Sequence, residues 1–216
     1  MEQAWIFVIA TLVFAIALGL RLYFAHRRTQ AIAALASQLG LTFLDKGNHL
    51  IPALIWNFDL FSKGRSRRVH NVLKGRANGA DVCLFDYSYR TGSGKNSSTH
   101  YHTVALLWTE KLDLPTFLLI PENLFHKIGR VFGYRDIDFG DYPQFSQRYL
   151  LRGTDEARIR QVFDYRVIPF YEQRQRTCTE GAGHAFIYYR TDGRLSPDRW
   201  SSLLNEAQTV VGLLSR

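Results

Sequence analysis

Two histidines, His100 and His102, lie two positions apart in a segment rich in β-forming residues, and their spacing could support chemistry. Side chains two positions apart on a strand point to the same face, so the two imidazoles could hold a metal ion together. No HExxH motif or cysteine cluster supplies further ligands by spacing. We therefore expect polar histidines near a strand end and no cofactor, with a metal pair as the alternative.

A glycine-rich loop precedes these histidines and has the composition of a phosphate-binding loop. Residues Gly92–Lys95 could offer backbone N–H groups and a lysine charge to an anion. The P-loop pattern, however, requires glycine where Tyr89 stands and serine or threonine where Asn96 stands. The loop also joins two expected strands, whereas a P-loop opens a helix. We therefore favour a hairpin loop over nucleotide binding.

Carboxylates and thiols form no recognised site by spacing. Asp136, Asp138 and Asp141 could attract a hard cation, but the EF-hand order of ligands is absent, so we expect a turn with solvated acids. Cys83 belongs to a core-facing series, which indicates a buried thiol. Cys83 and Cys178 are too few for a disulfide framework, which favours a reducing compartment.

Six basic residues with no acid among them form a run in the first half of the chain. The formal net charge is +8, which favours anionic partners. Such a run attracts anionic lipid headgroups by about 1 kcal/mol for each residue that touches the surface. No nucleic-acid-binding motif is recognisable, so nucleic acid is the weakest partner, and lipid contact or a solvated basic face are the remaining interpretations. The run comprises Lys63, Arg65, Arg67, Arg68, Lys74 and Arg76.

The N-terminal segment predicts a transmembrane helix. The uncharged run Ala4–Leu20 covers about 25 Å of a hydrocarbon core about 30 Å thick, and Arg21 and Tyr23 can complete the span at the interface. Basic residues follow the span, so the positive-inside rule predicts a single-pass inner (plasma) membrane protein with a cytoplasmic C-terminal domain. We expect residues 1–28 to form the anchor and its basic flank, and residues 29–216 to form one soluble domain.

A β-hairpin is the clearest expected element of that domain. Segments 69–76 and 81–89 flank Asn78-Gly79, a pair that favours a type I′ turn. The aromatic residues of the second segment alternate with polar residues such as Asp86, so the aromatic set should face the core.

Further strands and helices give an α+β fold class: an antiparallel sheet with a C-terminal packing helix. The order is similar to that of a pleckstrin-homology domain. We expect a turn at Glu180–Gly183 and an amphipathic final helix that is capped by Ser196 and begins at Pro197. Other strands are expected at 41–44, 99–109, 115–120, 148–152 and 184–190, and other helices at 29–39, at 121–128 and after a cap at Thr154.

Several motifs resemble an uncharacterised bacterial family over residues 29–215. The resemblance implies an N-terminal membrane helix joined to a domain of unknown function, and it implies no activity and no functional residues. The motifs lie at Asn71–Gly75, Phe85–Tyr89 with Thr91–Lys95, Asp136–Phe139 and Phe145–Gly153 with Asp155 and Glu156.

Two functional hypotheses follow. The first is a non-enzymatic, membrane-tethered binding or scaffold module with a protein partner that the sequence does not specify. The second is a membrane-tethered enzyme that uses dispersed residues, with His100, His102 and Asp86 as candidates. An enzyme requires these groups to converge in a pocket, whereas a binding module requires an exposed charged or apolar surface.

Overall fold

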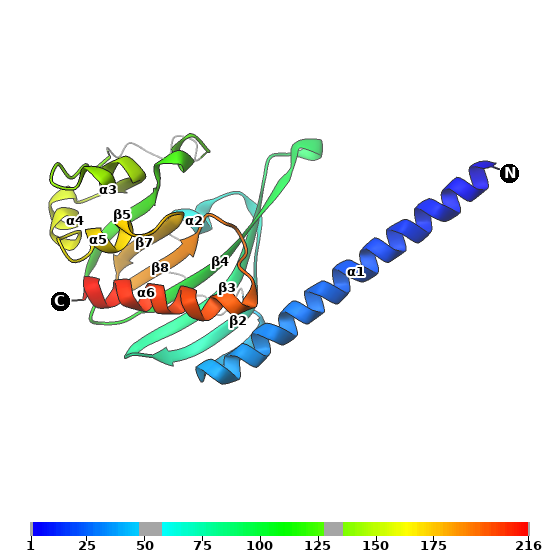
Figure 1. The fold of residues 1–216 in the computed structure, drawn as a ribbon, viewed down its shortest axis with the longest axis horizontal. Coiled ribbons are helices and arrows are strands. Elements are labelled where there is room, and N and C mark those ends of the chain that lie inside the picture. The colour runs from blue at the N-terminus through cyan, green and yellow to red at the C-terminus, as the bar shows by residue number, and fades with distance from the viewer. Residues whose placement is uncertain (1, 48–57, 128–135, 216) are drawn as a thin grey trace.

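A computed structural model describes residues 2–47, 58–127 and 136–215. The first helix, α1, runs without a break over Glu2–Leu39 and projects far out of the folded domain (Figure 1). Within the described residues, α1 is the helix long and apolar enough to cross a membrane. Its residues 5–27 are exposed, whereas Ile32 and Ala36 are buried against the sheet. The predicted apolar stripe over 29–39 therefore continues the anchor helix directly.

Eight strands form one sheet in the order β1-β2-β3-β4-β8-β7-β5-β6, and every neighbouring pair is antiparallel. The fold is therefore α+β, as predicted. Beyond β4 the sheet is not a simple series of hairpins, because the next neighbour of β4 is β8. The strands are β1 (Thr42–Lys46), β2 (Arg65–Ala77), β3 (Ala80–Thr91), β4 (Ser98–Trp108), β5 (Leu114–Pro121), β6 (Tyr149–Gly153), β7 (Thr177–Gly183) and β8 (Ala185–Arg190).

The predicted hairpin is confirmed and joins β2 to β3. Asn78 and Gly79 have φ angles of 54° and 79°, as a type I′ turn requires. Both strands are longer than predicted, because β2 begins at Arg65 and β3 continues to Thr91.

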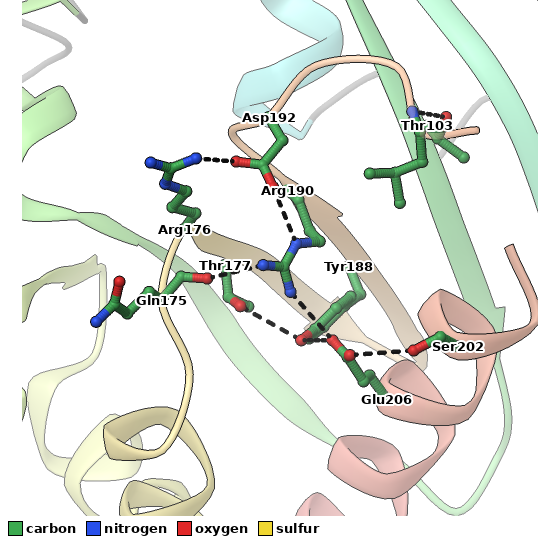
Figure 2. Close-up of polar contacts among 10 residues, drawn as sticks. Thr103, Gln175, Arg176, Thr177, Tyr188, Arg190, Asp192, Ser202 and Glu206 are labelled. Atoms are coloured by element: carbon green, nitrogen blue, oxygen red, sulfur yellow. Dashed lines mark hydrogen bonds and ion pairs between the residues drawn. The ribbon is translucent and has the colours of Figure 1, made fainter. Parts of the chain in front are cut away.

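The C-terminal helix α6 (Trp200–Leu214) packs across one face of the sheet (Figure 1). Its apolar stripe is buried as predicted, from Trp200 to Leu214. Ser196 makes no side-chain cap, and Pro197 begins a short 3-10 helix, η4 (Pro197–Arg199), in place of the α-helix itself. Figure 2 shows a polar network that also holds α6: Tyr188 of β8 donates to Glu206 at 2.6 Å.

Both faces of the sheet are covered. One core includes α6, the end of α1 and the short helices that follow β5. A second core lies on the opposite face of the sheet around Phe61 and Tyr87. Asp86 therefore does not face solvent, although it alternates with the aromatic residues of β3: it is only 4% exposed. The remaining elements are α2 (Asp59–Ser62), η2 (Gly94–Asn96), η3 (Glu122–Lys127), α3 (Pro143–Arg148), α4 (Glu156–Val162) and α5 (Ile168–Glu172).

The short helix expected at 121–128 is present as the 3-10 helix η3, and its expected end at Ile128-Gly129 lies outside the described residues. Two other local predictions were wrong. The cap of α4 is Asp155, whose side chain accepts from the Arg158 N–H, and not Thr154. Glu180–Gly183 belongs to β7, because pairing with β8 holds these residues in a strand despite their two glycines.

Candidate functional site

A buried ion pair joins α1 to the middle of the sheet. Arg28 donates to both carboxylate oxygens of Asp86, from Nε at 2.9 Å and from a terminal nitrogen at 2.8 Å. The side chains are 13% and 6% exposed. Asn71 and Thr103 donate to the same carboxylate at 3.0 and 3.1 Å. Asp86 thus accepts four hydrogen bonds, which meets the requirement that a buried charge be paired and bonded.

The backbone of β2 is shaped for this network. Asn71 lies in the left-handed region, with φ 53°, at an irregularity in the register between β2 and β3. Bulges of this kind re-aim a side chain, and here the amide of Asn71 reaches Asp86 while its oxygen accepts from Thr29 of α1 at 3.0 Å. Arg28 also lies 5.9 Å above the ring of Trp200. α1, the sheet and α6 are therefore joined at one point.

The hairpin β3–β4 extends past this point in the direction in which α1 leaves the domain. A cavity between α1 and the sheet is lined by Ala25 and Arg28 of α1, by Asp86 and Ser88 of β3 and by Tyr101 of β4. α1, β3 and β4 therefore lie beside one another beyond the ion pair. Figure 1 shows the hairpin tip and the N-terminal half of α1 pointing to the same side. We call residues 65–68, the β3–β4 hairpin end at 88–101, and Arg194 beside Tyr101 the exit end of the domain.

The lengths of these segments set the reach of the hairpin. At about 3.3 Å per residue, the tip at Gly94 lies about 26 Å beyond Asp86 along the strand. At 1.5 Å per residue, Arg21 lies about 10 Å beyond Arg28 along the helix. Measured along the strand and along the helix, the hairpin is long enough to reach the level of Arg21, which follows the apolar part of α1.

The predicted basic run is divided between two ends of β2. Arg65 and Arg68 are exposed at the exit end, whereas Lys74 and Arg76 lie at the other end of the strand. Arg76 pairs with Asp81 at 3.5 Å.

Two further members of the run serve the turn between α2 and β2. Lys63 pairs with Asp59 at 2.6 Å and is largely covered. Arg67 donates to the backbone oxygens of Ser62, Lys63 and Gly64 and so holds the turn together.

Cations at the exit end lack acidic partners among the described residues. Arg65, Arg68 and Lys95 form no ion pair there, and Arg194 makes only a cation–π contact with Tyr101, at 5.3 Å. Lys74 is also without an acid, but it lies at the other end of β2. Far from the exit end, four arginines are paired with acids, whereas Arg148 and Arg174 donate only to backbone oxygens. The four pairs are Arg158 with Asp113, Arg160 with Glu156, Arg166 with Asp164 and Arg176 with Asp192.

The candidate catalytic trio does not converge. Asp86 is opposite Thr103 in the register and Tyr87 is opposite His102, so Asp86 and the histidines lie on opposite faces of the sheet. His100 and His102 stack on Tyr89, with ring centroids 4.9 and 5.9 Å away. Burial lowers the pKa of His102 to about 4, so this imidazole is neutral at pH 7.

A second buried carboxyl group, Glu180, was missed because its segment was expected to be a turn. It accepts from the N–H groups of Asp59 and Leu60 at 2.5 and 3.0 Å, and from the hydroxyl of Tyr189 at 3.2 Å. Burial, with Asp59 as a second cause, raises its pKa to about 7, against the opposing effect of Lys63. These contacts attach α2 to the sheet, which is a structural role.

The loop Gly92–Lys95 is a hairpin tip, as predicted, and its residues are exposed. Gly92 and Gly94 have φ angles of 74° and 54°, which explains their presence in the turn. The loop joins β3 to β4 through η2 and opens no long helix. It therefore presents Lys95 without the geometry of a P-loop.

The other candidate ligands are also separated. Asp136, Asp138 and Asp141 are all exposed, and Asp136 accepts from the Leu151 N–H at 3.0 Å. Within residues 2–47, 58–127 and 136–215, no group of three His, Cys, Asp or Glu side chains could hold a metal ion. Cys83 and Cys178 are buried free thiols, and burial raises the pKa of both, that of Cys83 to about 12. Both thiols are therefore unreactive at neutral pH.

Comparison with known proteins shows the fold alone. No protein-family model matches the sequence, and no curated protein sequence is significantly similar. Among solved structures, the crystal structure of the mycobacterial trehalose monomycolate transport factor A, TtfA, is similar, with a TM-score of 0.64 and 15% sequence identity. The similarity covers 87% of this chain and 94% of that chain.

Proposed function

We propose that this chain is a non-catalytic, membrane-anchored binding or scaffold module whose exit end lies against anionic headgroups on the cytoplasmic face of the inner membrane. One observation carries the proposal: Arg65, Arg68 and Lys95 lack acidic partners within the described residues and lie at the end from which α1 leaves. An anionic leaflet attracts each nearby basic residue by about 1 kcal/mol, so unpaired cations at this end would stabilise contact between the domain and the membrane.

Length and topology support the same arrangement. α1 is long enough to span, and Arg21, Arg27 and Arg28 follow its apolar part, which favours a cytoplasmic domain. We place Lys95, at the tip of the β3–β4 hairpin, at the depth of the headgroups, which requires the hairpin to be inclined to α1, because a parallel hairpin would carry its tip about 16 Å beyond Arg21. Its polar tip suits that depth, because serine, asparagine and lysine side chains remain hydrated there.

The fold comparison is compatible with a non-catalytic role. The similar structure is that of a trehalose monomycolate transport factor. We extend to this chain only the idea of a membrane-associated accessory protein, without the substrate. The enzyme alternative is weakened because Asp86 and the two histidines lie on opposite faces of the sheet.

A single-cysteine probe tests the proposal. The natural thiols are buried, so Ser97→Cys can be labelled selectively with a polarity-sensitive fluorophore on the full chain. The labelled chain is placed in nanodiscs of phosphatidylcholine alone or with phosphatidylglycerol. We expect blue-shifted emission with phosphatidylglycerol, reduced in 1 M salt, where the Debye length is about 3 Å.

Glu110→Cys is the matched control, because Glu110 is exposed after β4, at the end opposite the hairpin tip. Its emission should not depend on lipid charge. In the variant Arg65→Gln/Arg68→Gln, the shift at Ser97 should fall. An emission at Ser97 that does not differ between the two lipid mixtures contradicts the proposal.

A further inference from the structure

Two hollows meet at one arginine beside α1. The cavity between α1 and the sheet has a volume of about 220 Å³. An open groove of about 520 Å³ is lined by residues 99–102 of β4 and by residues 191–194. Tyr101 and Arg194 line both. Arg194 is therefore placed between two spaces that a ligand could enter.

The cavity reaches a particular level of α1. Its wall includes Ala25, which lies five residues after Leu20, the end of the uncharged run. In a chain whose α1 spans the membrane, this level corresponds to the headgroup region. A phospholipid that packs its acyl chains against α1 would place its phosphate beside the cavity.

Arg194 supplies a cationic donor in the wall of the cavity. Its guanidinium lies 5.3 Å from the ring of Tyr101 and has no acidic partner among the described residues. Arg28, the other arginine in the cavity wall, is committed to Asp86. A guanidinium presents a planar fork of donors that matches phosphate oxygens, and tyrosine is favoured at membrane interfaces.

The acidic residues of the cavity select among phosphates. Asp86 is neutralised by Arg28, but Asp45 is exposed on the cavity wall. A carboxylate near the site repels a doubly charged phosphomonoester more strongly than a singly charged phosphodiester. The cavity therefore suits a phosphodiester headgroup.

We propose that Arg194, held over Tyr101, binds the phosphodiester of one membrane phospholipid in the cavity beside α1. The inference rests on the proposed function, because it requires α1 in the membrane and the exit end at the headgroups. It adds a binding site for one lipid at Arg194 to the nonspecific attraction between the exit end and anionic headgroups.

Native mass spectrometry of the full chain tests the site. The chain is released from micelles that contain phosphatidylglycerol, phosphatidic acid or phosphatidylcholine, and the fraction that retains one lipid is measured. We expect retention of one phosphatidylglycerol, and about tenfold weaker retention for Arg194→Gln, because a charge-assisted bidentate contact is lost. Arg194→Lys should recover part of the binding, and Tyr101→Phe should retain it, because the ring remains.

Arg68→Gln is the matched control. Arg68 is exposed at the exit end but does not line the cavity, so its loss should leave retention of one lipid unchanged. Equal losses for Arg68→Gln and Arg194→Gln, or tighter retention of phosphatidic acid than of phosphatidylglycerol, would overturn the inference. Displacement of the lipid by soluble glycerol phosphate at equal concentration would also overturn it, because the ligand would then be a free phosphate ester.

The probe at Ser97 separates this inference from the proposed function. A normal salt-sensitive shift at Ser97 with no retained lipid contradicts only the site at Arg194. Absence of the shift contradicts the proposed function itself, whatever the mass spectra show.

Discussion

Replacing Arg28 by glutamine should destabilise the domain far more than any other change at an arginine of α1. The change leaves the carboxylate of Asp86, which is 4% exposed, with only the neutral donors of Asn71 and Thr103. Removing one partner of a buried ion pair typically costs about 3–5 kcal/mol. Because Asp86 keeps two hydrogen bonds, we expect the lower end, about 3 kcal/mol of the free energy of unfolding.

Urea unfolding of the full chain in neutral micelles, followed by near-ultraviolet circular dichroism, measures this loss. With a slope of about 2 kcal/mol per molar urea, the midpoint should fall by about 1.5 M. Arg27→Gln is the control, because Arg27 is exposed one position earlier and its loss should change stability by less than about 0.5 kcal/mol. Equal midpoints for the two variants would refute the reasoning, because the pair would then contribute nothing that is specific to burial.

Three further outcomes follow from the same structure. The pKa of Glu180 is raised from 4.5 to about 7, so its stabilising contribution is complete below about pH 4.5 and is lost as pH rises through about 7. The difference in unfolding free energy between the natural chain and Glu180→Gln should follow that course in urea titrations at each pH. Gly64→Ala should lower stability by about 1–3 kcal/mol in thermal unfolding, because Gly64 has φ 59° and an added methyl would meet a β3 carbonyl. Calorimetry with Zn²⁺ should give the same stoichiometry for the natural chain and for the variant His100→Ala/His102→Ala, because the described residues offer no third ligand.

The sequence predicted the elements whose signals are local. The apolar stripe from Trp200 to Leu214 has a helical period, and Asn78-Gly79 specifies its turn through backbone angles alone. Both signals depend on residues within a few positions of each other. The neighbours β4 and β8 were not predicted, because their pairing joins segments about 80 residues apart and has no local pattern.

The site was harder to predict because burial depends on both faces of the sheet. The alternation in β3 was correctly recognised, but α1 and α6 also cover the face on which Asp86 lies. Asn71 was an unused signal, since an asparagine next to the buried pair Val72-Leu73 of a strand favours an irregularity in the backbone. The basic run looked continuous in sequence, but β2 has 13 residues and is about 40 Å long, so its charges cannot form one patch.

The hydrogen bonds that join α1 to the sheet at Asp86 determine which property of the domain the basic exit end can affect. In the proposed arrangement, α1 already holds the domain at the membrane, so Arg65 and Arg68 should add little to the fraction bound, because their local concentration near the lipid is fixed. Their effect is instead on orientation. A weak attraction of about 1 kcal/mol per residue is enough to favour one tilt of a domain that cannot rotate about a flexible linker. Loss of the Arg28–Asp86 pair should therefore disturb the position of the hairpin tip even with every exit-end cation in place, since the tip is positioned through α1.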